Sequence, residues 1–138
     1  MKIKFGIASA IGALSLAGCA TFSNMETGLN TLMGQPLQAA IDTLGYPQGQ
    51  MHVGEDTVYG WGREFTVNMP QYQTSNTYGQ VGGTSFSANT GTTTYVPTNY
   101  NCNVRIAVGP DNRIKNWEFD GNIGGCEAYS SRLKRLAE

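Results

Sequence analysis

Residues 102–119 read CNVRIAVGPDNRIKNWEF and decide the fold class. Their first half alternates apolar with polar or small residues, the period of a half-buried strand, with apolar positions at Cys102, Val104, Ile106 and Val108. Residues 109–112 have the composition of a turn. In the return segment Trp117 and Phe119 share a face while Ile114 is out of phase, so we expect a bulge near 115–116. The stretch predicts an antiparallel hairpin.

Helical periodicity appears on both sides of this hairpin. Residues 25–33 predict a short first helix, which Gly34 ends. Pro36 suits the start of a second helix, whose apolar residues recur at i, i+3, i+4 and i+7: Leu37, Ala40, Ile41 and Leu44. A third helix is expected to open at Cys126, with Tyr129, Leu133 and Leu136 on one side.

Between the helices and the hairpin lie a loop, a strand and an insertion. Residues 48–57 are polar and predict a loop, and the period changes to two from Val58. Gly60 and Gly62 mark a face of this strand that is either approached closely or left uncovered. Residues 70–100 are rich in Gly, Thr and Tyr. They could form a long hairpin with its tip at 82–83, or an unstructured insertion with too few aliphatic groups to offset the entropy of ordering.

Strands and helices are segregated along the chain, which favours an α+β fold with an antiparallel sheet. We expect two N-terminal helices and one C-terminal helix packed on a three-stranded antiparallel sheet. The domain organisation follows: a signal peptide at 1–18, a lipidated tether at 19–24, and a single domain at 25–138 that contains the insertion 70–100.

The N-terminus has the three parts of an export signal. Lys2 and Lys4 precede an uncharged apolar run that is shorter than a membrane-spanning helix requires. Leu-Ala-Gly-Cys at 16–19 then resembles the lipobox of bacterial lipoproteins. This resemblance implies cleavage before Cys19, lipid on its thiol, and two or three acyl chains that hold the protein on a membrane. The residue after the cysteine is Ala20 and not the Asp that marks retention in the inner membrane. The resemblance therefore implies that the protein is located in the outer membrane and faces the periplasm.

Composition restricts the remaining chemistry. Loss of Lys2 and Lys4 with the signal leaves seven basic against ten acidic residues, a net charge near −3, which argues against nucleic acid as a partner. In an oxidising compartment Cys102 and Cys126 predict a disulfide. The alternative, a metal site at this pair, lacks further ligands because His52 is the only histidine. We therefore expect no metal and no cofactor.

No catalytic motif is recognisable, so we expect a protein that is not an enzyme. His52, Glu55 and Asp56 carry acid–base chemistry close together in the sequence, but a solvated polar loop explains them as well. Aromatic residues in and beside the uncharged insertion are better candidates, for contacts with a protein or a glycan: Tyr72, Tyr78, Phe86, Tyr95 and Tyr100. Trp61, Trp117 and Phe119 are expected in the core.

Several short motifs, spread over about two thirds of the mature chain, are similar to those of one family. They are the lipobox, Gly-Gln-Pro at 34–36, Leu-Gly-Tyr-Pro at 44–47, Tyr-Gly-Trp at 59–61, and the hairpin 104–117. The chain resembles small lipoproteins related to the BamE (SmpA/OmlA) subunit of the outer-membrane barrel-assembly machinery. The cysteine pair and the uncharged insertion depart from that family and indicate a divergent branch. The resemblance implies a scaffold or adaptor for another envelope protein; peptidoglycan binding and, last, a hydrolase are the alternatives.

Overall fold

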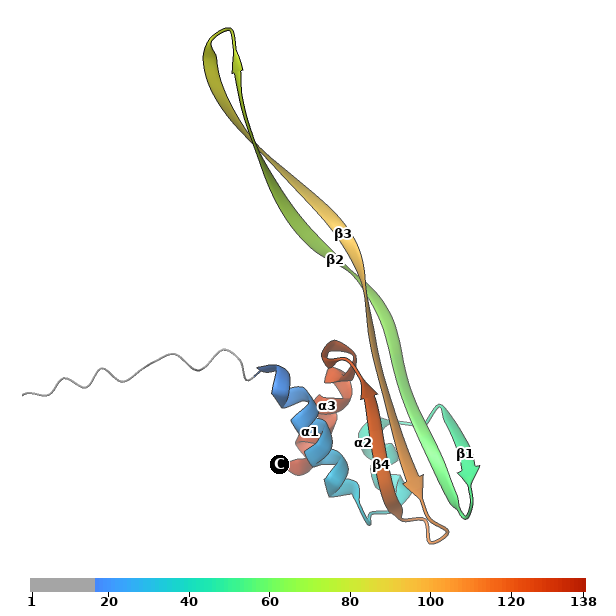
Figure 1. Cartoon of the computed structure of the whole chain (residues 1–138). Helices are drawn as coiled ribbons and strands as arrows, with labels where there is room; N and C mark the ends of the chain where they lie inside the picture. The colour runs from blue at the N-terminus through green and yellow to red at the C-terminus, as the bar shows by residue number, and fades with distance from the viewer. Residues whose placement is uncertain (1–16) are drawn as a thin grey trace, which may run out of the picture.

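The computed structural model describes the backbone of residues 17–138 and the side chains of residues 20–138. Residues 1–16 of the expected signal peptide and the side chain of Cys19 lie outside this description. Three helices cover one face of an antiparallel sheet with the strand order β1-β2-β3-β4 (Figure 1). The α+β class is confirmed, but the sheet has four strands instead of the three expected.

The elements follow one another as α1 (Ala17–Leu32), α2 (Leu37–Leu44), β1 (Gly49–Val53), β2 (Asp56–Val81), β3 (Thr84–Val108), β4 (Ile114–Gly121) and α3 (Ile123–Ala137). The expected bulge is present, because Ala107 pairs with Asn116 and Val108 with Ile114, which leaves Lys115 as the extra residue. In residues 17–138 no helix has both the length and the apolar character needed to cross a bilayer.

Three boundaries differ from the sequence predictions. The expected loop 48–57 contains β1, which pairs with residues 56–60 of β2. The expected tether 19–24 belongs to α1, where the Phe22 ring packs 5.8 Å from that of Phe119. Helix α3 begins at Ile123, before Cys126, because the Asn122 side chain caps it by accepting a hydrogen bond from the Gly125 backbone N–H at 2.9 Å.

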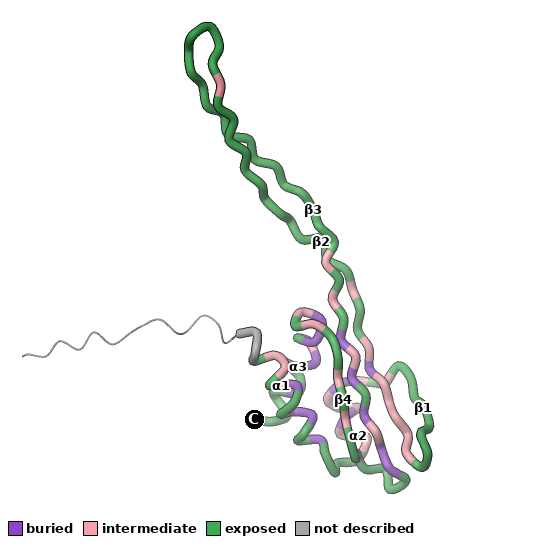
Figure 2. Tube along the Cα trace, in the orientation of Figure 1, coloured by how far each residue is buried: buried purple, intermediate pink, exposed green. Residues whose placement is uncertain are grey.

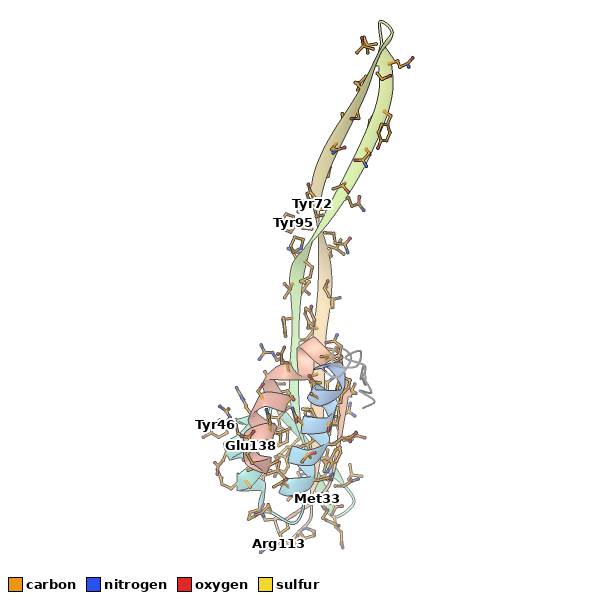
Figure 3. All side chains as sticks on the ribbon, turned by 90° about the vertical axis from the view of Figure 1, so that its left-hand side faces the viewer. Met33, Tyr46, Tyr72, Tyr95, Arg113 and Glu138 are labelled. Carbon is orange, nitrogen blue, oxygen red and sulfur yellow. A yellow bond between two sulfur atoms is a disulfide. The ribbon has the colours of Figure 1, made fainter. Side chains whose placement is uncertain are left out.

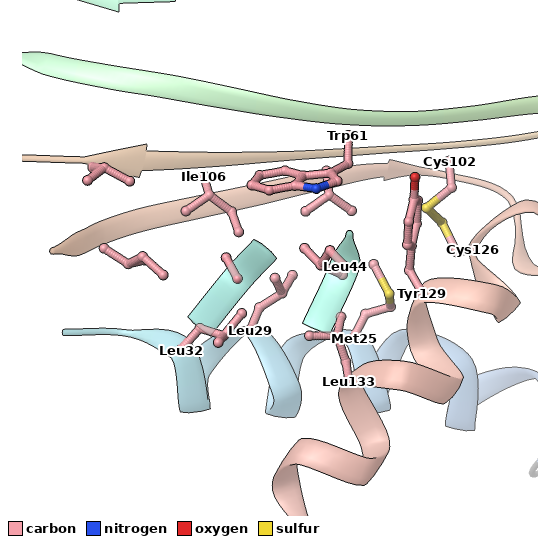
Figure 4. Packing of buried hydrophobic residues seen from close by; sticks show 14 residues of the cluster. Met25, Leu29, Leu32, Leu44, Trp61, Cys102, Ile106, Cys126, Tyr129 and Leu133 are labelled. Atoms are coloured by element: carbon pink, nitrogen blue, oxygen red, sulfur yellow. A yellow bond between two sulfur atoms is a disulfide. The ribbon is translucent and has the colours of Figure 1, made fainter. Parts of the chain in front are cut away.

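The core lies between the helices and the sheet (Figure 4). Trp61 is almost fully buried, and its indole N–H donates to the Gly45 carbonyl at 2.7 Å, which fixes the end of α2 to the sheet. Its expected place in the core is confirmed, while Trp117 and Phe119 are half-buried against the same cluster. The largest fully buried side chains of the described residues are Met25, Leu29, Leu32, Val104, Ile106, Leu133 and the two cysteines.

Two close contacts hold the helices in place. At Gly28 of α1 a Cβ atom would overlap Leu133 of α3, so glycine allows these helices to approach each other. The predicted disulfide between Cys102 and Cys126 is present and joins β3 to α3. A loop of this length, with a sequence separation of 24, is expected to stabilise the fold by about 3–4 kcal/mol on the chain-entropy account.

The insertion forms a regular hairpin that leaves the domain (Figures 1 and 2). Strands β2 and β3 pair continuously from Thr57–Val108 to Val81–Thr84, and Gly82 and Gly83 form the tip with positive φ values of 58° and 80°. Of the two alternatives for the insertion, a long hairpin or an unstructured segment, the long hairpin is therefore the one observed. We call residues 66–99 the arm. Nearly all of its residues are exposed on both faces, so the arm has no core of its own.

Candidate binding surfaces

The five aromatic residues proposed as contacts do not form one patch. Tyr72, Tyr78 and Tyr95 lie on the same face of the arm and are 70%, 76% and 67% exposed. Tyr72 and Tyr95 are near each other along the arm (Figure 3). Phe86 lies on the opposite face. Tyr100 is half-buried at the base, where its ring stacks 5.2 Å from that of Phe65, so it belongs to the packing of the domain.

Two aromatic rings cover glycines on the opposite strand of the arm. A Cβ atom at Gly91 would overlap the Tyr72 ring, and one at Gly79 would overlap the ring of Phe86. An aromatic ring over a cross-strand glycine replaces the side-chain contact that the glycine lacks. These two contacts provide local packing for a hairpin that would otherwise be marginally stable in water.

The sheet face opposite the helices carries a polar groove at the base of the arm. Its cavity measures about 450 Å³, and its lining residues are Gln48, Gly62, Arg63, Glu64, Asn99, Asn101 and Asn103. Gly60 and Gly62 lie on this face without side chains, and no helix in the described part of the chain covers it (Figure 1). Gly60 is therefore left uncovered, whereas Gly62 is approached closely, because a Cβ atom there would lie 3.0 Å from the Gln48 side-chain oxygen and 3.2 Å from that of Asn103. Amides and a carboxylate can exchange hydrogen bonds with hydroxyl or peptide groups.

Side-chain amides end the pairing on both edges of the hairpin. On the β2 edge, the Gln48 amide donates to the Gly62 carbonyl at 2.7 Å and accepts from the Gly62 N–H at 2.8 Å. On the β3 edge, the Asn122 amide donates to the Asn99 carbonyl at 3.0 Å. Each amide makes the hydrogen bonds that one more residue of the neighbouring strand would make. The neighbouring strands β1 and β4 therefore stop where the arm begins.

These contacts also show which backbone groups of the arm point outward. In an antiparallel pair, alternate residues direct both N–H and C=O away from the partner strand. On β2 both backbone groups of Gly62 point outward, to the Gln48 amide, and on β3 the Asn99 carbonyl points outward, to the Asn122 amide. Because the register is continuous to the tip, the outward residues are the even-numbered ones on β2 and the odd-numbered ones on β3. Both edges of the arm therefore present unpaired backbone groups.

A proline interrupts each edge near the base of the arm. Pro70 on β2 and Pro97 on β3 are both outward residues by this alternation, so neither removes a bond between the two strands. Each removes one outward N–H from its edge. Beyond them, the distal arm (residues 71–96) has a free edge on either side. No charged residue occurs from Phe65 to Val104, so the lysines that commonly protect exposed edges are missing.

In and beside the β1–β2 turn, His52 and Asp56 each contact a different polar partner. The Asp56 carboxylate accepts a hydrogen bond from the Lys115 ammonium at 2.9 Å, and this bond raises the Lys115 pKa. The His52 Nδ1 lies 3.1 Å from the Thr57 hydroxyl. Among residues 17–138, no group of three or more His, Cys, Asp or Glu side chains could hold a metal ion. The described contacts of this turn therefore pair Asp56 with Lys115 and His52 with Thr57.

Sequence reasoning missed the groove and the two amides that end the edges. Gln48 was placed in a loop, and Asn122 precedes a helix start that was predicted three residues too late. The alternation of Asn99, Asn101 and Asn103 on one strand face was available as a signal, because every second strand residue shares a face. Its meaning depends on the open side of the sheet, which only the tertiary structure reveals.

The described chain is thus an α+β domain with a projecting two-stranded arm, a polar groove at its base and helices on one face only. Comparison of the sequence and structure with protein-family models, curated proteins and solved structures found no match in any of the three.

Proposed function

We propose that this protein is a lipid-anchored, non-catalytic scaffold or adaptor of the bacterial envelope, and that its arm binds another envelope protein. The observation that carries the proposal is the arm: an exposed hairpin with unpaired strand edges and no core. Extended polypeptides add to such edges through backbone hydrogen bonds, while neighbouring side chains select the partner. Tyr72 and Tyr95 provide aromatic contacts on one face of the arm.

The lipobox supports the anchor in this proposal. The arm leaves the domain at the end where α1 begins (Figure 1), so a lipid at Cys19 would be attached near its base. An arm in this position can extend along the membrane surface and reach a neighbouring membrane protein. The sequence resemblance to lipoproteins of the outer-membrane assembly machinery agrees with such a role and with the outer membrane as its location.

A crosslinking experiment in intact cells tests the adaptor role. A tagged copy is crosslinked, purified and analysed by mass spectrometry beside a Tyr72→Ser/Tyr95→Ser variant. Because aromatic anchors commonly supply more than 1 kcal/mol each, we expect recovery of the partner to fall about tenfold. Tyr46→Ser is the matched control, since Tyr46 is 87% exposed but lies between α2 and β1, away from the arm. It should leave recovery unchanged.

Two results would contradict the adaptor role. One is that no envelope protein is reproducibly enriched with the wild-type chain. The other is equal enrichment with the arm variant and the wild type, which would remove the arm from the binding surface. Because Tyr72 also packs over Gly91, amide hydrogen exchange must show that the arm of the variant keeps its strand pairing before lost recovery counts as lost binding.

The polar groove favours a second candidate function, binding of a neutral glycan such as peptidoglycan strands. No hydrogen bond of the Asn101 or Asn103 side chain occurs within residues 20–138, so both amides are available to sugar hydroxyls. At about 1 kcal/mol per hydrogen bond, Asn101→Ala/Asn103→Ala should lower co-sedimentation with purified sacculi about tenfold. Asn116→Ala, on the same sheet face outside the groove, is the control. A wild-type protein that stays in the supernatant would eliminate this candidate.

A further inference from the structure

The longer free edge of the distal arm belongs to β3. Its outward residues run from Ser85 to Tyr95 at every second position. Of the side chains at these positions only that of Tyr95 is aromatic, and Gly91 is covered by the Tyr72 ring from β2. The β2 edge is shorter, from Tyr72 to Gln80, and carries two tyrosines. Residues 92–96 are also the part of the arm with the strongest strand propensity.

The sequence of the arm permits this edge to pair with a second copy of itself. Repulsion between like charges is a common barrier to edge pairing of identical strands. The arm has no charge on either strand, so two copies meet without repulsion. Pairing of one edge with itself in antiparallel orientation is isologous, since each strand presents the same groups to the other about a two-fold axis.

Pro97 limits the length of such pairing. It removes an outward N–H next to the domain, so an added strand loses a hydrogen bond at that position. Asn122 already occupies the edge below it, at Asn99 and Asn101. The available edge is therefore the segment Ser85–Tyr95, which spans roughly 35 Å at 3.4 Å per residue.

We propose that the β3 edges of two copies pair antiparallel over Ser85–Tyr95 and join the two arms into a four-stranded sheet. This inference rests on the proposed function, in which the arm is the binding element, and names a second copy as one of its partners. The two domains lie at opposite ends of the paired arms, and each β2 edge remains free for another protein. Two copies anchored in one membrane can adopt this arrangement when their arms lie along its surface.

Sedimentation of the full chain purified in a mild detergent tests the proposal. The wild-type protein should sediment as a dimer. Three variants are compared, each with one asparagine of an arm edge replaced by lysine. Asn89 lies on the β3 edge and faces Asn76 on the β2 edge of the distal arm. Asn68 lies on the β2 edge between Pro70 and the domain. Because a lysine on a strand edge opposes pairing, Asn89→Lys should raise the dimer dissociation constant roughly tenfold or more. Asn76→Lys and Asn68→Lys should change it little.

Amide hydrogen exchange separates lost pairing from lost folding of the arm. In the wild-type dimer the outward N–H groups of Ser87, Gly91 and Thr93 should be protected, while those of Thr74 and Tyr78 exchange rapidly. In Asn89→Lys the outward β3 groups should exchange rapidly, but the inward N–H groups of Phe86 and Thr94 should keep their protection. Loss of the inward protection would mean that the variant unfolds the arm. The proposal then depends on the wild-type protein alone, in which protected outward β3 groups support pairing and rapidly exchanging ones contradict it.

Two outcomes would overturn the inference: a wild-type protein that is monomeric at every concentration tested, or dissociation by Asn76→Lys and not by Asn89→Lys. A monomer that still captures an envelope protein through Tyr72 and Tyr95 would leave the adaptor role intact. A dimer that captures nothing else would support the inference and contradict the adaptor role.

Discussion

Replacing Cys19 with serine is expected to abolish incorporation of fatty acid into this protein completely. Residues 16–19 resemble a lipobox, in which the sulfur of the cysteine thiol takes the lipid. Serine has no thiol. Cells grown with an alkyne-tagged fatty acid should label the wild-type band and leave the Cys19→Ser band unlabelled. Mass spectrometry should also show that the wild-type protein lacks residues 1–18, while the variant is not cut at this site.

Cys102→Ser is the matched control, because this cysteine lies in the disulfide with Cys126 and not in the signal. It should keep full labelling.

A second test replaces the signal with one that a general signal peptidase removes, so that the domain is exported without lipid. It should then leave the membrane fraction, because two or three acyl chains bind a bilayer stably and their loss removes that attachment. Labelling of Cys19→Ser, or a wild-type protein without label, would refute the lipoprotein assignment.

Gly125→Ala is expected to lower the free energy of unfolding by about 3 kcal/mol. Alanine has the higher helix propensity, so propensity alone predicts a gain of up to about 1 kcal/mol. The structure predicts the opposite sign, because a Cβ atom at this place would overlap the backbone of Asn101. Backbone atoms cannot rotate away as a side chain can, so α3 and β3 must move apart and strain the Cys102–Cys126 bridge between them.

Urea denaturation followed by tryptophan fluorescence measures this effect, since Trp61 lies in the core. Gly49→Ala is the control: it is the same substitution on an exposed strand, with no atom within 4 Å of the added Cβ. Its unfolding free energy should stay within about 0.5 kcal/mol of the wild type. Equal stabilities of the two variants would show that α3 does not approach β3 as closely as described.

The arm and the domain have different physical requirements. The domain is held by a buried apolar cluster and a disulfide. The arm depends on backbone hydrogen bonds between two strands, helped by Tyr72 over Gly91 and Phe86 over Gly79. Isolated two-stranded hairpins are marginally stable in water. A pairing partner on either edge of the arm would add hydrogen bonds and buried surface, so binding and ordering of the arm should be coupled.

The sequence determined the elements whose signal is local and periodic. Alternation over 102–108 predicted the strand, the i, i+3, i+4 pattern predicted α2, and the phase shift of Ile114 predicted the bulge at Lys115. The cysteine pair predicted the disulfide. These features follow from side-chain period and from redox chemistry, which require no knowledge of distant contacts. The lipobox assignment at Cys19 rests on the sequence alone and awaits the labelling experiment.

Only the tertiary structure decided the features that depend on contacts distant in sequence. The segment 49–53 alternates polar and apolar residues over only four positions, and it becomes β1 because the edge of β2 offers it hydrogen bonds. Whether the insertion was ordered could not be settled from composition, since its stability depends on a register that begins inside the domain at Thr57–Val108. The groove and the free edges exist because β1 and β4 end early and the helices cover one sheet face, and no local sequence pattern encodes where neighbouring strands stop.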